Sequence, residues 1–153
     1  LGRAAQDEVA IGVFQPVGPV GRTARELRDL RLALQVRHLL ARAPYDQQLM
    51  VYRSTPYRVA FYNYHHWASS PGEQVAEWTL RYLRQSGLFA QVMAAPGTSG
   101  ELVLGGVIRD FEEVDRDGVW EAVLGVDFYL TKGDQQPPLW SRSFQVRRAA
   151  ARL

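Results

Sequence analysis

Two adjacent histidines beside a tryptophan, in the stretch YHHWASSPGE at 64–73, are the first residues to consider for chemistry. Successive residues of an extended segment point to opposite faces, so His65 and His66 cannot bind one ion unless the chain kinks. The third histidine, His38, falls in a different predicted strand. Because a metal site needs three or four converging ligands, we expect no metal site here.

The acidic residues at 112–117 share their composition with a calcium-binding loop but lack its spacing. The segment DRDG has neither the twelve-residue length nor the terminal glutamate that calcium chelation requires, so a charged hairpin tip is expected. Glu112 and Glu113 are neighbours in a predicted strand and do not form a facing acid and base. No P-loop, dinucleotide fingerprint or nucleophile elbow occurs. The sequence therefore predicts neither catalytic residues nor a cofactor.

The second half of the quoted stretch predicts the start of a helix. Ser70 is a favourable N-cap, Pro71 occupies the first helical position, and Glu73 completes a capping box. Apolar residues then recur at helical spacing, and Gly87 provides a left-handed stop. We expect a strand-to-helix corner with Trp67 wedged beneath it.

Alternation of apolar and polar residues predicts the first strand, at 31–40. Its apolar side would hold Leu32, Leu34, Val36 and Leu40. His38 falls in the same register, where a hydrogen-bonded and partly buried histidine is expected.

Further strands are predicted at 57–64, 101–111, 119–130 and 139–147. The segment EEVDRDG, between the second and third of these, is polar and ends in Asp-Gly, so the two strands form a predicted antiparallel hairpin.

Composition limits the classes of protein. No run approaches the roughly 20 apolar residues of a membrane-spanning helix, and the absence of cysteine excludes disulfides and thiolate metal sites within this sequence. The formal charge is +2, with 18 cationic residues dispersed among 16 acidic ones. A stripe of positive charge is the mark of nucleic-acid binding, so we expect no nucleic-acid partner.

These patterns predict an α+β fold, with a mainly antiparallel or mixed β-sheet and one or two helices packed on one face. A length of 153 residues suits a single domain. Within it we expect an irregular N-terminal region at 1–29, with a candidate strand at 9–14, and a core at 30–148. Residues 23–30 are a second helix candidate or a turn into the first strand.

Aromatic residues are concentrated around the strand-to-helix corner. Tyr52, Tyr62, Tyr64 and Trp67 are therefore the candidate residues for binding a partner or a lipid, because aromatic side chains combine apolar area with a polar group. The competing interpretation is that Trp67 staples the helix entrance into the core and that the tyrosines only cover the sheet.

The order of the segments adds a resemblance to a known family. The segments are YDQQLMVYR (45–53), YRVAFYNYHHWASSPGE (57–73), a helix exit with SGLFAQV (86–92), and LVLGGVIRDFE (102–112). Over about residues 30–148 this series resembles the ABC-type transport auxiliary lipoprotein component, the PqiC/YmbA-like family of envelope lipoproteins that accompany MCE-type lipid transporters.

The resemblance implies a periplasmic domain that is tethered to the outer membrane through an N-terminal lipidated cysteine. It would work with a permease, an ATPase and an MCE protein. Because the sequence contains no cysteine, we expect the signal peptide and the anchor to precede Leu1 in the full-length protein. Family members usually also carry a C-terminal helix, and the end of this sequence, RRAAARL, leaves that feature open.

Two functions remain open. The first is a non-catalytic docking or structural subunit that forms a homo-oligomer or binds the MCE-type membrane protein of an ABC transporter complex. The second is a lipid-binding shuttle of the cell envelope, with an apolar surface between sheet and helix for an acyl chain. An enzymatic function is the least favoured of the three.

Overall fold

A computed structural model of the protein describes residues 32–94, 102–133 and 137–150. The candidate strand at 9–14 and the candidate helix at 23–30 lie outside these residues. In chain order the elements are β1 (Ala33–Val36), β2 (Leu40–Ala41), β3 (Leu49–Thr55), β4 (Arg58–His66), α2 (Pro71–Ser86), β5 (Gln91–Ala94), β6 (Leu102–Arg116), β7 (Val119–Lys132) and β8 (Trp140–Ala149).

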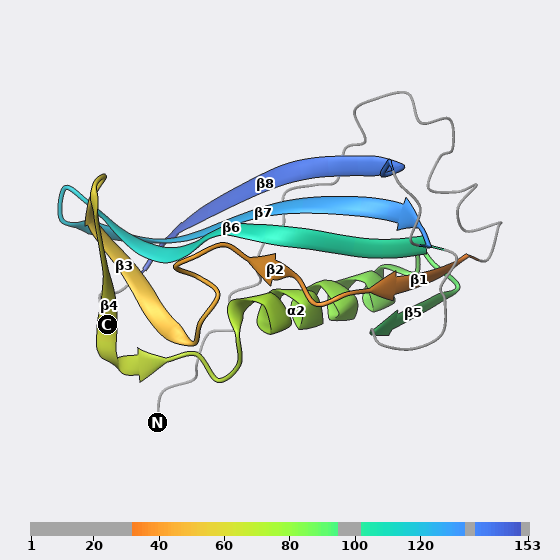
Figure 1. Ribbon diagram of the computed structural model, residues 1–153, viewed down its shortest axis with the longest axis horizontal. Coiled ribbons are helices and arrows are strands. Elements are labelled where there is room, and N and C mark those ends of the chain that lie inside the picture. The colour runs from red at the N-terminus through yellow and green to blue at the C-terminus, as the bar shows by residue number, and fades with distance from the viewer. Residues whose placement is uncertain (1–31, 95–101, 134–136, 151–153) are drawn as a thin grey trace.

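The long strand β6 organises the sheet. Along one edge it pairs antiparallel with β7, and along the other it pairs in parallel with β1, β2 and β3 in turn. Strands β5, β4 and β8 extend the sheet beyond β1, β3 and β7. Figure 1 shows β6, β7 and β8 as three long, curved strands, with β3 and β4 turning away at one end. The α+β fold with a mixed sheet is thus confirmed.

The predicted hairpin is formed by β6 and β7. The register runs from Leu102 opposite Lys132 to Arg116 opposite Val119. Asp117 and Gly118 join the strands with φ angles of 55° and 86°, which is the left-handed pair of a two-residue type I′ turn. The polar turn predicted over EEVDRDG is shorter in the structure, because residues 112–116 pair with β7 and only Asp117 and Gly118 form the turn.

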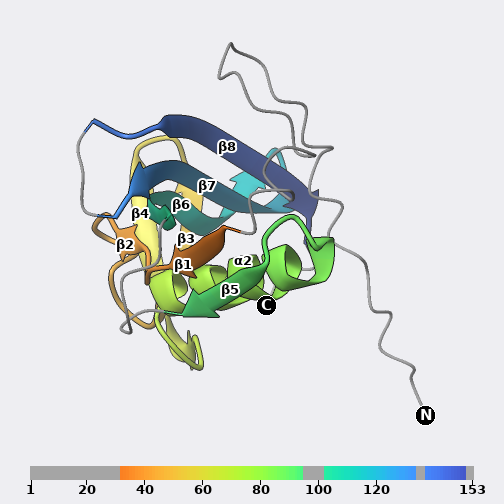
Figure 2. The ribbon, with the colours of Figure 1, turned by 90° about the vertical axis from the view of Figure 1, so that its right-hand side faces the viewer.

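The helix α2 begins and ends where the sequence predicts. The Ser70 side chain accepts a hydrogen bond from the Glu73 backbone amide, and the Glu73 side chain accepts one from the Ser70 backbone amide. At the other end, Gly87 adopts the left-handed conformation, with a φ angle of 63°. Figure 2 shows α2 on one face of the sheet beside β1 and β5. A Cβ atom at Gly72 would overlap the Leu39 carbonyl, so glycine lets the first helical turn approach the link between β1 and β2.

The prediction of one continuous strand at 31–40 is wrong. The strand β1 ends at Val36, with one further backbone hydrogen bond from the Arg37 amide to the Leu104 carbonyl, and regular pairing resumes only at β2. The Leu39 amide donates to the Gly72 carbonyl, so the chain leaves the strand register to meet the helix. As a result Leu39 is 5% exposed while Leu40, which was expected in the core, is 68% exposed. His38 is exposed as well, so its expected partial burial is not observed.

The edge strand β4 contains a pronounced irregularity. Val51 pairs with Phe61, but Leu49 pairs with His66, so β4 carries three more residues than β3 over this interval. The extra residues bend the chain toward Trp67, whose amide donates to the Gln48 carbonyl. Alternation in the sequence predicts Tyr62 and Tyr64 on one face of this strand; in the structure Tyr62 is partly buried, whereas Tyr64 is 91% exposed.

The core lies between the sheet and α2. It is built from apolar residues of the strands, the helix and the intervening loops. Its buried members are Leu34, Val36, Leu39, Tyr45, Val51, Val75, Ala76, Val92, Leu102, Ile108, Phe111 and Val126.

Candidate functional site

Two neighbouring carboxylates of β6 organise the most distinctive region of the structure. Glu112 and Glu113 are only 8% and 9% exposed. As successive strand residues they point to opposite faces of the sheet. A buried carboxylate is costly unless it is paired or hydrogen-bonded, so each of them requires a partner on its own face.

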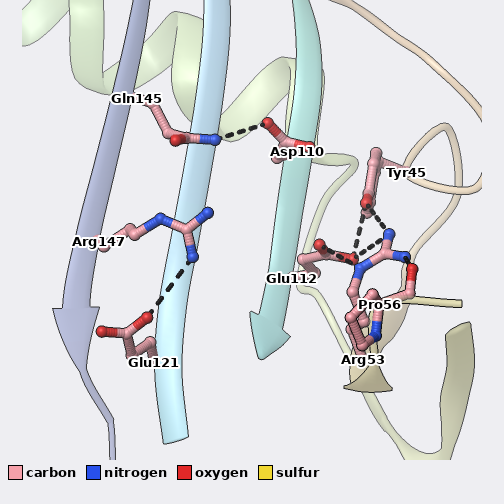
Figure 3. Close-up of polar contacts among 8 residues, drawn as sticks. All are labelled: Tyr45, Arg53, Pro56, Asp110, Glu112, Glu121, Gln145 and Arg147. Carbon is pink, nitrogen blue, oxygen red and sulfur yellow. Dashed lines mark hydrogen bonds and ion pairs between the residues drawn. The ribbon is translucent and has the colours of Figure 1, made fainter. Parts of the chain in front are cut away.

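Glu112 is held by Arg53 and Tyr45, as Figure 3 shows. Arg53 donates to both carboxylate oxygens, Nε to Oε1 at 2.9 Å and Nη2 to Oε2 at 3.1 Å. The Tyr45 hydroxyl donates to Oε2 at 2.7 Å. Arg53 also donates to the Pro56 carbonyl at 3.2 Å. This buried cluster joins the loop before β3, β3 itself and β6.

The electrostatics of this cluster suit a structural role. Burial, followed by the hydrogen bond to Glu112, raises the pKa of the Tyr45 hydroxyl above its usual range. The hydrogen bond to Glu112 raises the pKa of the Arg53 guanidinium. Both groups therefore hold their protons near neutral pH, so neither Tyr45 nor Arg53 is a general base or an activated nucleophile there.

Replacing Tyr45 with phenylalanine is expected to change how stability depends on alkaline pH. The pKa of Tyr45 is higher in the folded protein than in the unfolded chain, where it is about 10. The contribution of Tyr45 to stability is therefore fully present below about pH 10 and is lost as the pH rises above that value. Above about pH 10 the free energy of unfolding should therefore fall more steeply in the unmodified protein, by up to roughly 1.4 kcal/mol per pH unit. Urea unfolding at several pH values checks this, and parallel slopes for both proteins would contradict it.

Glu113 supports an aromatic ladder on the opposite face of β6. The Tyr62 hydroxyl donates to its Oε2 at 2.6 Å. The ring centroids of Tyr52 lie 4.8 Å from Tyr62 and 6.3 Å from Trp120. His65 meets the Tyr62 ring edge-on at 5.3 Å. We use the name aromatic ladder for these four rings, Trp120, Tyr52, Tyr62 and His65, which come from β7, β3 and β4.

The aromatic ladder borders a groove of about 770 Å³ at the end of the β6–β7 hairpin. The groove is open and contains polar as well as apolar groups. Its lining residues are Tyr52, Ser54, Asp115, Gly118, Val119, Trp120 and Ala150.

The structure brings together two of the four predicted site residues. Tyr52 and Tyr62 stack in the aromatic ladder. Tyr64 lies in the irregular part of β4 and is 91% exposed. Trp67 packs against Phe111 at 4.7 Å in contact with the core, as the staple interpretation expects. Whether any of the four binds a partner stays a prediction.

The sequence analysis missed the polar partners of this region. The motif YDQQLMVYR contains both Tyr45 and Arg53, and its eight-residue separation gave no indication that they meet at Glu112. Trp120 offered a weak signal, since it lies two residues after Gly118 of the hairpin turn, in a strand whose register places it opposite Asp115.

The described residues contain no group of three or more histidine, cysteine, aspartate or glutamate side chains placed to hold a metal ion. Within the same part of the chain, no helix has the length and apolar character needed to cross a membrane.

Comparison with known proteins identifies the family. The model of the ABC-type transport auxiliary lipoprotein component family matches residues 15–152. The chain belongs to this family. No curated protein matches the sequence.

Two solved structures share the fold. The first is protein XCC0632 from Xanthomonas campestris, of family DUF330, with a TM-score of 0.70 and 22% identity over 79% of this chain and 68% of that one. The second is the crystal structure of an uncharacterized protein, with a TM-score of 0.65 and 19% identity over 78% of this chain and 74% of that one. At these identities the likeness shows the fold alone.

The family description assigns these lipoproteins an auxiliary role in ABC-type transport. A lipoprotein of a transport system is associated with a membrane of the cell envelope, which agrees with the resemblance seen in the sequence.

Proposed function

We propose that this chain is a non-catalytic docking or structural subunit of an ABC transporter complex that contains an MCE-type membrane protein and moves lipids. In this proposal the domain lies in the periplasm, and the full-length protein is anchored to the outer membrane by a lipid. It uses no cofactor or metal, and it contacts either the MCE-type protein or further copies of itself.

The observation that carries this proposal is the aromatic ladder with its rigid support. Tyrosine and tryptophan are enriched at protein interfaces because they bury a large area at a small entropic cost. The partly buried Arg53–Glu112 pair on the reverse face fixes β3 against β6, and β3 carries Tyr52. A firmly held surface loses little conformational entropy on binding, which suits docking.

Tyr64, whose side chain is 91% exposed, allows a direct test in cells. A photo-crosslinking residue placed at Tyr64 of the full-length protein is expected to capture the MCE-type protein or a second copy of the chain. The same residue at Tyr82, an exposed position on α2, serves as the matched control. Capture at Tyr82 without capture at Tyr64 would contradict docking through the β4 side of the molecule.

A lipid-binding shuttle is the second candidate, and one observation favours it. A groove of about 370 Å³ lies between β1 and α2, with Val36, Ala76 and Leu80 as apolar lining and His38 and Glu77 as polar lining. Its volume is near the lower end of the range for ligand pockets, about 300–1,000 Å³. A phospholipid retained through purification of the monomer would favour the shuttle over the docking subunit.

A further inference from the structure

The groove beside the aromatic ladder combines π faces with negative charge. Tyr52 and Trp120 contribute rings to its lining, and Asp115 contributes a carboxylate. Glu113 lies two residues before Asp115 in β6 and pairs with Tyr52 across the strands. Its carboxylate accepts a hydrogen bond from the Tyr62 hydroxyl, which is an uncharged donor.

This combination is suited to an organic cation. The face of an aromatic ring attracts a guanidinium or ammonium group within about 6 Å of its centroid, and tryptophan does so best. A nearby carboxylate adds Coulombic attraction, which is weak at an exposed site but selects the sign of the ligand. A guanidinium can stack on a ring and hydrogen-bond to a carboxylate at the same time, because it is planar and has five donors.

The surroundings of the groove favour a protein side chain over a lipid headgroup. Its lining includes Gly118 of the hairpin turn, Ser54 and Asp115, so it is open and partly polar. The groove between β1 and α2 lies elsewhere, because β1 pairs with residues 102–104 at the far end of β6 from the turn. The two grooves share no lining residue, so they do not form one continuous site for a headgroup and its acyl chain.

We infer that the groove between β3 and the β6–β7 turn accepts an arginine or lysine side chain of a partner protein, held between Tyr52, Trp120 and Asp115. This inference rests on the proposed docking function and specifies the chemistry of the contact. It assigns to the partner a basic residue on a projecting segment.

A titration with short peptides tests the inference. The probe is a blocked tetrapeptide with two central arginines, and its neutral counterpart carries citrulline at both positions. The indole N–H resonance of Trp120 is followed by NMR in the folded protein. The arginine peptide is expected to shift this resonance saturably, whereas the citrulline peptide leaves it unchanged.

Two variants and one control define the site. Asp115→Asn can still accept the hydrogen bond from the Gly118 amide through its side-chain oxygen, so the turn should persist while the charge is lost. Its affinity for the arginine peptide is expected to fall about threefold to fivefold. Tyr52→Leu removes the ring and should weaken binding by a similar factor. Asp117→Asn, at the exposed tip and outside the groove lining, should leave the affinity unchanged.

The alternative outcomes are distinct. Equal shifts with both peptides, or equal losses in Asp115→Asn and Asp117→Asn, would overturn the cation site. Binding to phosphatidylethanolamine vesicles that is lost in Asp115→Asn, without peptide binding, would replace the protein side chain by a lipid headgroup. If Tyr64 still captured the MCE-type protein while the peptides failed to bind, the docking function would stand and only this contact would be wrong.

Discussion

Replacing Arg53 with alanine is expected to lower the free energy of unfolding by about 3–5 kcal/mol at pH 7. Arg53 supplies two hydrogen bonds to Glu112, a carboxylate that is almost entirely buried. Without the guanidinium, Glu112 keeps only the Tyr45 hydroxyl as a donor from this cluster. The cost arises mainly from leaving a buried charge without its counter-ion. Urea unfolding followed by circular dichroism measures the change.

The exposed pair on α2 provides the control for this prediction. Arg81 lies 3.3 Å from Glu77, and both side chains are largely in solvent. Arg81→Ala should therefore cost less than about 0.5 kcal/mol. If Arg53→Ala cost no more than Arg81→Ala, the cluster around Glu112 would not be the support that we describe.

Replacing Trp67 with alanine is expected to cost about 3 kcal/mol, near the lower end of the range for large aromatic residues because Trp67 is only partly buried. Its ring packs on Phe111 at 4.7 Å, and its amide holds the corner to Gln48. The substitution leaves that backbone hydrogen bond possible but removes the packing beneath the entrance to α2. Thermal unfolding monitors the loss.

Trp78 is the matched control for Trp67. Its ring is 6.5 Å from the same Phe111 ring, but the side chain is 47% exposed. Trp78→Ala should cost about 1 kcal/mol, because much less area returns to water. Equal losses in the free energy of unfolding at the two positions would show that the packing of Trp67 does not stabilise the strand-to-helix corner.

Elements set by local rules could be predicted from the sequence. The capping box at Ser70 and the left-handed Gly87 define α2 through hydrogen bonds within a few residues. The Asp117-Gly118 turn likewise fixes the β6–β7 hairpin. In both cases the information lies in adjacent residues, so the prediction needs no knowledge of the rest of the fold.

Elements set by distant contacts could not be predicted in this way. Leu39 replaces Leu40 in the core because the helix start at Gly72 draws the chain out of its strand register. The irregularity in β4 has a comparable cause, because the chain must bring Trp67 within reach of the Gln48 carbonyl. The alternation of apolar and polar residues in the sequence does not indicate either constraint.

The candidate site shows the same division. Aromatic content alone drew attention to Tyr52 and Tyr62, and the structure stacks them. Their support comes from Glu113 and, through β3, from Arg53 and Glu112, which are 59 residues apart in sequence. A buried ion pair between such distant residues depends on the parallel pairing of β3 with β6, which no local pattern reveals.

The most direct test of the docking proposal is native mass spectrometry of the full-length protein, purified gently from envelope membranes, with subunit number and bound lipid recorded together. The proposal predicts a lipid-free assembly that contains the MCE-type protein or several copies of this chain. A monomer that carries one phospholipid would contradict it and would establish the chain as a carrier of the transported lipid.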